Sequence, residues 1–278
     1  MNDLTPRHVR DGSTLPRVRS VARAVSILRA FTPERRRLTL AEIVRTCGLD
    51  AGTTRRILVT LRDEGLVRQD PGDGTYCLSL DVLELASAVP EGNSLREVTE
   101  SRLVRLARDT GATVFLSIVR SGEALCLARY HGEAAVQVRW WSVGGKLPLN
   151  CGAGPKVLLA HLPEFQRQAF LSGPLDGLTP ASVTASRSLK REIDRIRRVG
   201  WAVSRDDVAV GLSAVAVPLQ NSDEATLAAI SVGGLTAQVL GPHPSATKPP
   251  PCLAALNRCR EDLMPVVRSM RSEADIGA

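Results

Sequence analysis

Hydrophobic residues recur at helical spacing in three short segments near the N-terminus. The first is residues 20–31, with Ser20 as its expected N-cap; the second is Thr39–Cys47; the third is Thr53–Glu64, capped by its own first residue. Positions three and four residues apart give each helix one hydrophobic face. A glycine follows the second and third segments, where it favours a chain reversal. The pattern predicts three packed amphipathic helices.

A short hairpin is predicted directly after the third helix. Residues 66–69 and 75–78 flank the turn sequence Asp70-Pro71-Gly72-Asp73-Gly74, which contains the residue types that favour tight turns. Helix, helix, turn, helix and hairpin is the layout of a winged helix-turn-helix, whose second turn helix enters the major groove of DNA. We therefore expect such a domain over residues 19–79, preceded by a flexible basic arm over residues 1–18. The alternative is a three-helix unit that contacts protein.

The charge of the chain favours the DNA interpretation. The 278 residues include 36 Lys and Arg against 29 Asp and Glu, which gives a formal net charge of +7. Residues 1–68 hold 14 Arg, no Lys and seven acidic residues, so they account for the whole excess. A local basic surface attracts polyanions because it displaces counterions condensed on the phosphates.

Short polar and arginine side chains of the third helix are the expected DNA contacts. Arginine suits guanine edges or phosphate, and threonine suits phosphate or a thymine methyl group. Arg68 lies at the base of the hairpin, where it would contact the flanking backbone. The expected DNA-binding residues are Arg19, Thr53, Thr54, Arg55, Arg56, Thr60 and Arg68.

The larger part of the chain, residues 69–278, has no net charge, and its pattern is typical of an α+β domain. A short linker helix is expected within residues 80–93, and a helix with a capping box beginning at Ser94 opens an expected domain over residues 94–272. Strands are expected at residues 113–119, 124–129, 136–141, 201–204, 213–219 and 227–232, and helices at 157–160, 188–199 and 253–270. Only nine aromatic residues occur in the whole chain, so the core must be mainly aliphatic.

Cysteine and histidine spacing indicates neither a zinc site nor a disulfide framework. The six cysteines include no C-x-x-C pair, and buried free thiols are the default in a reducing compartment. A nucleophilic set of Cys151, His161 and Asp206 is conceivable, but no motif brings the three together. An acid–base pair of Asp206 and Asp207 is a second possibility, although we expect that turn to expose both carboxylates. No metal or cofactor is expected. With neither a signal peptide nor a membrane-length apolar run, we expect a cytoplasmic protein.

Several stretches of the chain resemble the IclR-type transcriptional regulators. They are residues 20–28 (SVARAVSIL), 38–43 (LTLAEI), 56–61 (RILVTL), 144–149 (GGKLPL), 156–160 (KVLLA), 200–203 (GWAV) and 216–218 (AVP), in the order that the family has them. The resemblance covers about residues 19–240. It implies an N-terminal DNA-binding domain, a linker helix and a C-terminal effector-binding domain with a GAF-like antiparallel sheet. It also implies homodimers or homotetramers on palindromic operators.

Small residues leading into a helix at residues 150–156 favour a bound anion, because they expose backbone N–H groups at its positive end. The resemblance places the family's effector loop here. Relatives that recognise small keto acids carry polar side chains where this chain has Ala214 and Gly233, so a larger and more apolar effector is expected. The expected effector-binding residues are Trp141, Leu147, Asn150, Cys151, Gly152, Ala153, Gly154, Ser204, Leu212, Ala214, Ser231 and Gly233. The alternative for Trp141 is plain core or interface packing.

The sequence therefore predicts a non-enzymatic, ligand-responsive regulator that binds double-stranded operator DNA. Its effector is expected to be a carboxylic acid, with an aromatic acid or derivative as the leading class. Two other functions stay open. One is an enzyme that acts on a small acid in the C-terminal domain. The other is a DNA-binding protein without an effector, which leaves the larger domain unexplained.

Overall fold

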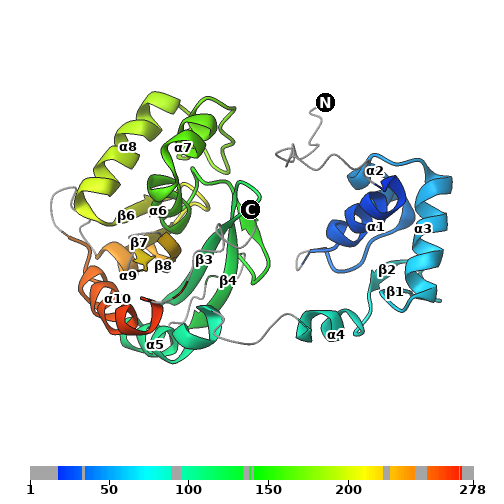
Figure 1. The fold of residues 1–278 in the computed structure, drawn as a ribbon, viewed down its shortest axis with the longest axis horizontal. Helices are drawn as coiled ribbons and strands as arrows, with labels where there is room; N and C mark the ends of the chain where they lie inside the picture. The colour runs from blue at the N-terminus through cyan, green and yellow to red at the C-terminus, as the bar shows by residue number, and fades with distance from the viewer. Residues whose placement is uncertain are drawn as a thin grey trace. The chain divides into compact units, whose positions relative to one another are not determined.

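The structure is a computed structural model that describes residues 18–32, 35–88, 95–133, 138, 141–221, 226–241, 249–268 and 270. It falls into two compact units, Met1–Gly92 and Asn93–Ala278 (Figure 1). Apart from Val18, the arm predicted over residues 1–18 lies outside the described residues, and so does Ser94, the first residue of the predicted capping box. No helix in the described segments is long and apolar enough to cross a membrane.

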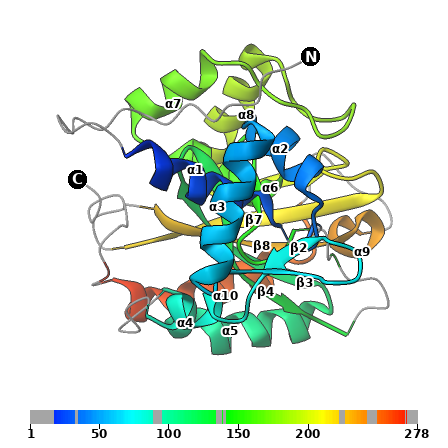
Figure 2. The same cartoon turned by 90° about the vertical axis from the view of Figure 1, so that its right-hand side faces the viewer.

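The first unit contains the expected three helices and hairpin. Its elements are α1 (Arg19–Ala30), α2 (Leu40–Cys47), α3 (Ala51–Asp63), β1 (Val67–Gln69), β2 (Tyr76–Leu78) and α4 (Val82–Ser87). Helices α1, α2 and α3 pack against one another (Figure 2). Ile27, Ile43 and Leu58, one from each helix, are fully buried where they meet. Helices α2 and α3 contribute their predicted hydrophobic faces, whereas α1 buries Ile27 and Ala30 and leaves Val21 and Val25 exposed. The arrangement confirms the winged helix-turn-helix fold.

Two helix starts differ from the sequence prediction. Helix α3 begins at Ala51 because Asp50, rather than Thr53, is its N-cap: the Asp50 carboxylate accepts the Thr53 N–H at 2.8 Å. Helix α1 begins at Arg19 without a side-chain cap, so Ser20 lies inside the helix. Aspartate is as good an N-cap as serine or threonine, and only backbone geometry decides which candidate is used. The turn before α3 follows the prediction, with Gly48 at a φ of +62°.

A six-stranded antiparallel sheet is the centre of the second unit. Its strands are β3 (Thr113–Arg120), β4 (Glu123–His131), β5 (Lys146–Leu147), β6 (Ala202–Arg205), β7 (Leu212–Gln220) and β8 (Thr226–Leu235). The order across the sheet is β5-β4-β3-β8-β7-β6. Strands β3 and β8 therefore lie side by side although about a hundred residues separate them. With its helices, this sheet confirms an α+β fold.

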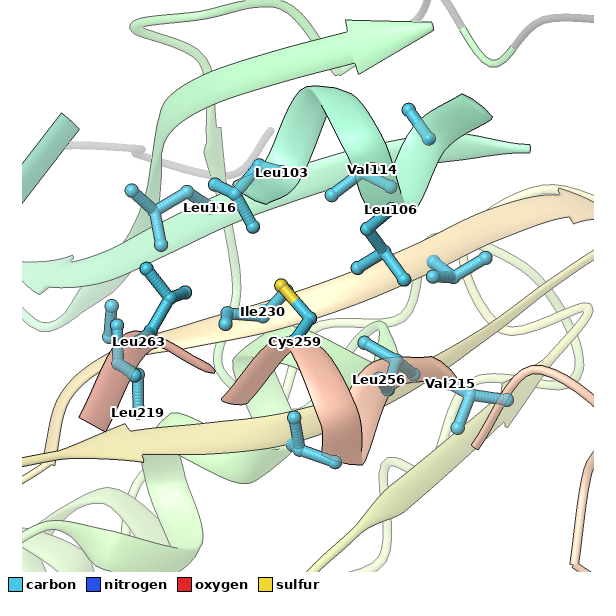
Figure 3. Packing of buried hydrophobic residues seen from close by; sticks show 14 of the residues in the cluster. Leu103, Leu106, Val114, Leu116, Val215, Leu219, Ile230, Leu256, Cys259 and Leu263 are labelled. Atoms are coloured by element: carbon cyan, nitrogen blue, oxygen red, sulfur yellow. The ribbon is translucent and has the colours of Figure 1, made fainter. Parts of the chain in front are cut away.

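Helices cover both faces of the sheet. They are α5 (Leu95–Thr110), α6 (Ala153–His161), α7 (Glu164–Leu171), α8 (Ser186–Val199), α9 (Thr236–Leu240) and α10 (Leu253–Val267). Helices α5 and α10 pack on one face, where Val114, Leu116 and Ile230 lie in one buried cluster with leucines of both helices (Figure 3). On the other face α6 lies on the central strands, and α8 packs on α6 (Figure 1).

Three elements were not expected from the pattern, and one expected strand differs. Strand β5 and helix α9 contain two and five residues, too few for a period to show, and α7 was also missed. The strand predicted over residues 136–141 lies partly outside the described residues. Within it, Val138 and Trp141 are described and neither is in a strand.

A buried ion cluster joins α6, α8 and the β6–β7 loop. The Lys156 ammonium lies 2.8 Å from Asp207 Oδ2 and 3.0 Å from Glu192 Oε1. The side chains of Lys156 and Asp207 are each only 3% exposed. Burial by itself lowers the pKa of Lys156, but the Asp207 and Glu192 carboxylates outweigh it and raise the pKa above its ordinary value. Lys156 is therefore charged at neutral pH, and the cluster fixes three segments around the start of α6.

Replacing Lys156 with methionine should destabilise the second unit by about 3–5 kcal/mol at pH 7, because it leaves two carboxylates without their buried cation. The pKa of Lys156 is raised in the fold, so this contribution is complete below the unfolded pKa of about 10.4 and is lost only as the pH rises through the folded value. Urea unfolding of the wild type and Lys156→Met between pH 6 and 9 measures the difference.

Lys190→Met is the matched control. Lys190 pairs with Asp194 at 3.2 Å on the surface, with side chains that are 57% and 52% exposed, so its loss should cost less than about 1 kcal/mol. Equal losses for the two variants would contradict the role assigned to the buried cluster.

Candidate functional site

The exposed face of α3 carries the expected DNA contacts in an accessible arrangement. Arg55, Arg56 and Thr60 are exposed and Thr53 is half-buried. Within the part of the chain that the structure describes, neither Arg55 nor Arg56 has a recorded ion pair. Arg19, at the start of α1, and Arg68, on β1, are exposed as well. These guanidinium groups are therefore available to an external anion.

Thr54 is a correction to the expected set. Its side chain is fully buried, and its hydroxyl donates to the Asp50 carbonyl oxygen at 2.9 Å. This position belongs to the hydrophobic stripe of α3 that packs on the other helices, so the side chain faces the core and cannot reach a base edge.

An arginine outside the expected DNA-binding set, Arg37, makes a structural contact with the hairpin. Arg37 lies before α2, and its guanidinium contacts Asp70 in the β1–β2 turn at 2.6 Å and Asp73 at 4.0 Å. Hydrogen bonding to Arg37 is the main cause that lowers the pKa of Asp70. Residues 33 positions apart meet here, so no local signal in the sequence indicates the contact. The exposed pair holds the hairpin against the helices.

A cavity opens on the α6 side of the sheet. Its volume is about 40 Å³, and on the same measure about 10–15 Å³ is enough for one water molecule. Strand register explains the space: Ser204 on β6 pairs with Ala214 on β7, which pairs with Gly233 on β8. Three small residues thus form one row across three strands, and they leave room above the sheet for a small organic molecule.

The walls of the cavity are mainly apolar and partly aromatic. The rings of Phe115 and Trp141 lie 5.3 Å apart at an angle of 31°, which is a tilted aromatic pair. The Trp141 indole N–H donates to the Gly145 carbonyl oxygen at 3.1 Å, so the ring has a fixed orientation. Val138 and Leu147 continue this wall, and Leu212 is a further apolar residue of the lining.

The first turn of α6 closes one end of the cavity. Gly152 precedes the helix at a φ of +94°, a conformation that glycine adopts without strain. Its N–H donates to Asp207 Oδ2 at 3.3 Å. The N–H groups of Ala153 and Gly154, in the first turn, have no acceptor within the helix. A side chain at Gly154 would place its Cβ 3.1 Å from the Ser117 hydroxyl, so glycine suits the close approach of α6 to β3.

Most of the expected effector residues come together in this lining. Those that line the cavity are Trp141, Leu147, Gly152, Ala153, Gly154, Ser204, Leu212, Ala214, Ser231 and Gly233. Asn150 and Cys151 are corrections, because neither lines it. The Asn150 amide donates to the Asp176 and Val183 carbonyl oxygens at 2.7 and 3.0 Å, and the Cys151 thiol donates to the Asp176 carbonyl oxygen. Both side chains hold the 176–183 segment instead.

The sequence interpretation missed six lining residues: Phe115, Val138, Pro155, Asp207, Val208 and Ser213. Phe115 pairs with Ser231 across β3 and β8, and this long-range register brings its ring to the cavity. Asp207 was expected to be exposed in a turn, yet it is 2% exposed and bound to Lys156. Strand alternation alone indicates that Phe115 faces opposite to Val114, but not that its face holds the cavity.

The residues considered for catalysis make separate structural contacts. Burial raises the pKa of the Cys151 thiol, which keeps it protonated rather than nucleophilic. Burial lowers the pKa of His161, whose Nδ1 lies 2.8 Å from the Val157 carbonyl oxygen. Asp206 accepts the Gly211 N–H at 2.6 Å. Among the described residues no group of three or more potential metal ligands occurs.

Comparison with known proteins gives a family match in each part of the chain. Residues 20–71 match the IclR helix-turn-helix domain, and residues 88–249 match the domain described as "Bacterial transcriptional regulator IclR C-terminal". The second match covers more than half of the chain. The HTH-type transcriptional regulator XynR of Escherichia coli K12 is 30% identical over 226 residues, which are 81% of this chain and 89% of XynR.

Solved structures of this fold include an IclR transcriptional regulator from Alicyclobacillus acidocaldarius, with a TM-score of 0.77 and 25% identity over 91% of this chain and 100% of that one. An IclR homolog from Microbacterium hydrocarbonoxydans, in complex with 4-hydroxybenzoate, has the same fold, with a TM-score of 0.75 and 24% identity. The match covers 89% of this chain and 98% of that one. On these matches, this chain belongs to the IclR family of bacterial transcriptional regulators.

Proposed function

We propose that this family member is a cytoplasmic regulator whose affinity for operator DNA changes when a small organic acid binds in the cavity of the second unit. The observation that carries the proposal is the cavity itself: ten residues expected to bind an effector line one apolar space beside the first turn of α6. The exposed arginines of α3 supply the DNA-binding half of the proposal.

Recognition of DNA is assigned to α3. In a winged helix-turn-helix this helix enters the major groove, and Arg55 and Arg56 lie close to its N-terminus, where side chains reach base edges. Arg19 and Arg68 lie at the start of α1 and on the hairpin, where contact with phosphates is expected. Thr60 completes the exposed surface of α3. Base contacts would give sequence selectivity, and phosphate contacts would give affinity.

The cavity favours an effector with an apolar body and one acidic end. Phe115 and Trp141 present aromatic surface to the cavity, while Ala214 and Gly233 contribute no hydrogen-bonding side chain. At the other end, the N–H groups of Ala153 and Gly154 and the positive end of the α6 dipole suit a carboxylate. An aromatic acid or a derivative of one matches this division. The similar fold that holds 4-hydroxybenzoate makes benzoates suitable first probes.

Coupling between the two activities requires that the effector bind one arrangement of the DNA-binding domains better than another. A coupling free energy of about 1–3 kcal/mol is typical of such proteins. We propose that the chain acts as a homodimer or homotetramer. Leu80, Leu83 and Leu85, in and before α4, are 78%, 64% and 61% exposed, and an apolar surface of this kind supports self-association.

An Arg55→Ala/Arg56→Ala variant should lose binding to operator DNA, because it removes two exposed cations near the start of α3. The measurement is a gel shift with the intergenic region beside the protein's own gene, at low salt. We expect a loss of affinity of about thirtyfold or more, at about 1–3 kcal/mol for each of two bidentate contacts, with an unchanged oligomeric state in size-exclusion chromatography.

An Arg105→Ala/Arg108→Ala variant is the control, since both residues are exposed on α5 in the second unit and the change in net charge is the same. Retained binding by the α3 variant would exclude α3 as the recognition helix. If the wild type did not shift the DNA probe, with or without candidate acids, the proposed function would be wrong.

Filling the cavity should abolish the response to effector while DNA binding persists. We expect benzoate and 4-hydroxybenzoate to raise the melting temperature of the wild type, and Ala214→Leu to lose this increase because the larger side chain occupies the space above the sheet. A thermal-shift series that compares aromatic acids with pyruvate and glyoxylate measures the effect, and gel shifts verify DNA binding.

Val210→Leu is the control variant, because Val210 lies in the neighbouring β6–β7 loop and is 79% exposed. It should respond as the wild type does. Stabilisation by the short keto acids alone would contradict the apolar effector class, and an undiminished response of Ala214→Leu would exclude this cavity as the effector site.

A further inference from the structure

Helix α8 carries a concentration of positive charge in a unit that is otherwise not basic. Its residues Ser186–Val199 include six basic and two acidic side chains, whereas the rest of the second unit, Asn93–Ala278, contains 16 basic and 15 acidic residues. The hydrophobic side of the helix is buried: Leu189, Ile193 and Ile196 are at most 1% exposed. The excess charge is therefore confined to the outer side of α8.

Three arginines form a stripe along that outer side. At 3.6 residues per turn, Arg187, Arg191 and Arg198 lie within about 40° of one another around the helix axis, and they extend over about 16 Å. All three are exposed. Arg191 makes a 3.3 Å contact with the Ser188 hydroxyl, and no ion pair is recorded for any of the three within the described segments. Asp194 lies on the same side of the helix, about 20° from Arg187 around the axis, and is paired with Lys190.

Helix stability does not account for the whole stripe. Arginine near a helix C-terminus is favourable because the dipole is negative there, and this covers Arg198. Arg187, however, lies in the first turn, where the dipole disfavours a cation, and that turn contains no acidic residue. On the same helix, Arg195 lies 4.4 Å from the centroid of the Trp201 ring. That arginine therefore has a packing role that the stripe residues lack.

We propose that the Arg187–Arg191–Arg198 stripe of α8 is a second DNA-binding surface, which contacts phosphates without reading sequence. A duplex carries one negative charge per about 1.7 Å of its axis, so a length of about 16 Å presents roughly ten phosphates. Arginine forms two parallel hydrogen bonds with a phosphate. The stripe has the length, exposure and charge to engage the sugar-phosphate backbone of a duplex.

This inference depends on the proposed function only in requiring that the protein bind DNA. Because phosphate contacts are independent of sequence, they can be measured on a duplex of arbitrary sequence, about 60 bp long, for which no operator is needed. The variant is Arg187→Gln/Arg191→Gln/Arg198→Gln, which removes three charges from exposed helical positions and leaves the buried face of α8 unchanged.

Fluorescence anisotropy over a range of salt concentrations gives the affinity and its salt dependence. The slope of log K against log [salt] should become shallower by about 2–3, at about 0.9 for each phosphate that the variant no longer neutralises. The affinity at about 100 mM salt should fall at least about tenfold. Selectivity for the intergenic probe over the arbitrary duplex should rise or stay constant, because the stripe contributes to binding of both.

The matched control is Arg105→Gln/Arg108→Gln/Arg258→Gln, on α5 and α10 across the sheet, where all three arginines are exposed. It changes the net charge by the same amount and should alter affinity less than about twofold, because that face is not assigned to DNA. Equal losses of affinity in the two variants would show that net charge alone causes the effect. An α8 variant with the affinity and salt dependence of the wild type would show that the stripe does not bind DNA. Either result overturns the proposal. If the wild type bound neither duplex, the proposed function would fail with it.

Discussion

The arrangement of the second unit depends on a buried ammonium group, that of Lys156, whose burial is unfavourable without nearby carboxylates. Lys156 projects from α6 into the interior, where an uncompensated ammonium is strongly disfavoured. It is accommodated because Asp207 and Glu192 come from two other segments to meet it. The same contact sets the β6–β7 loop, α8 and the first turn of α6 relative to one another. One wall of the cavity and the helix behind it are therefore held by a single buried cation.

This cluster links features that would otherwise look separate. Asp207 lines the cavity and Glu192 lies on α8, so the space assigned to the effector and the basic outer helix share one ionic contact. The Gly152 N–H adds a bond to the Asp207 carboxylate at the start of α6. A ligand that displaces the β6–β7 loop would alter the environment of Lys156.

Local patterns predicted the elements far better than they predicted the site. Apolar spacing placed α1, α2 and α3, and the hairpin, because each depends on neighbours within a few residues. The cavity depends instead on pairing between Ser204, Ala214 and Gly233, which come from three strands. Family resemblance identified ten of the lining residues. Phe115 and Asp207 were missed because a β3–β8 register and a buried lysine bring them there. Asn150 and Cys151 were misplaced because the carbonyl groups that they bind come from a distant segment, residues 176–183. Thr54 was misplaced although helical spacing puts it in the hydrophobic stripe of α3.

The sequence by itself determined that the chain consists of a basic N-terminal DNA-binding domain and a second part with little net charge. Net charge and helical period are properties of neighbouring residues. The sequence also determined the family, whose motifs follow in order along the chain. Only the tertiary structure decided where the free space lies, which carboxylates hold Lys156, and that three arginines of α8 share one exposed side. These features arise where distant segments meet, and the free energy of burial, rather than local preference, selects them.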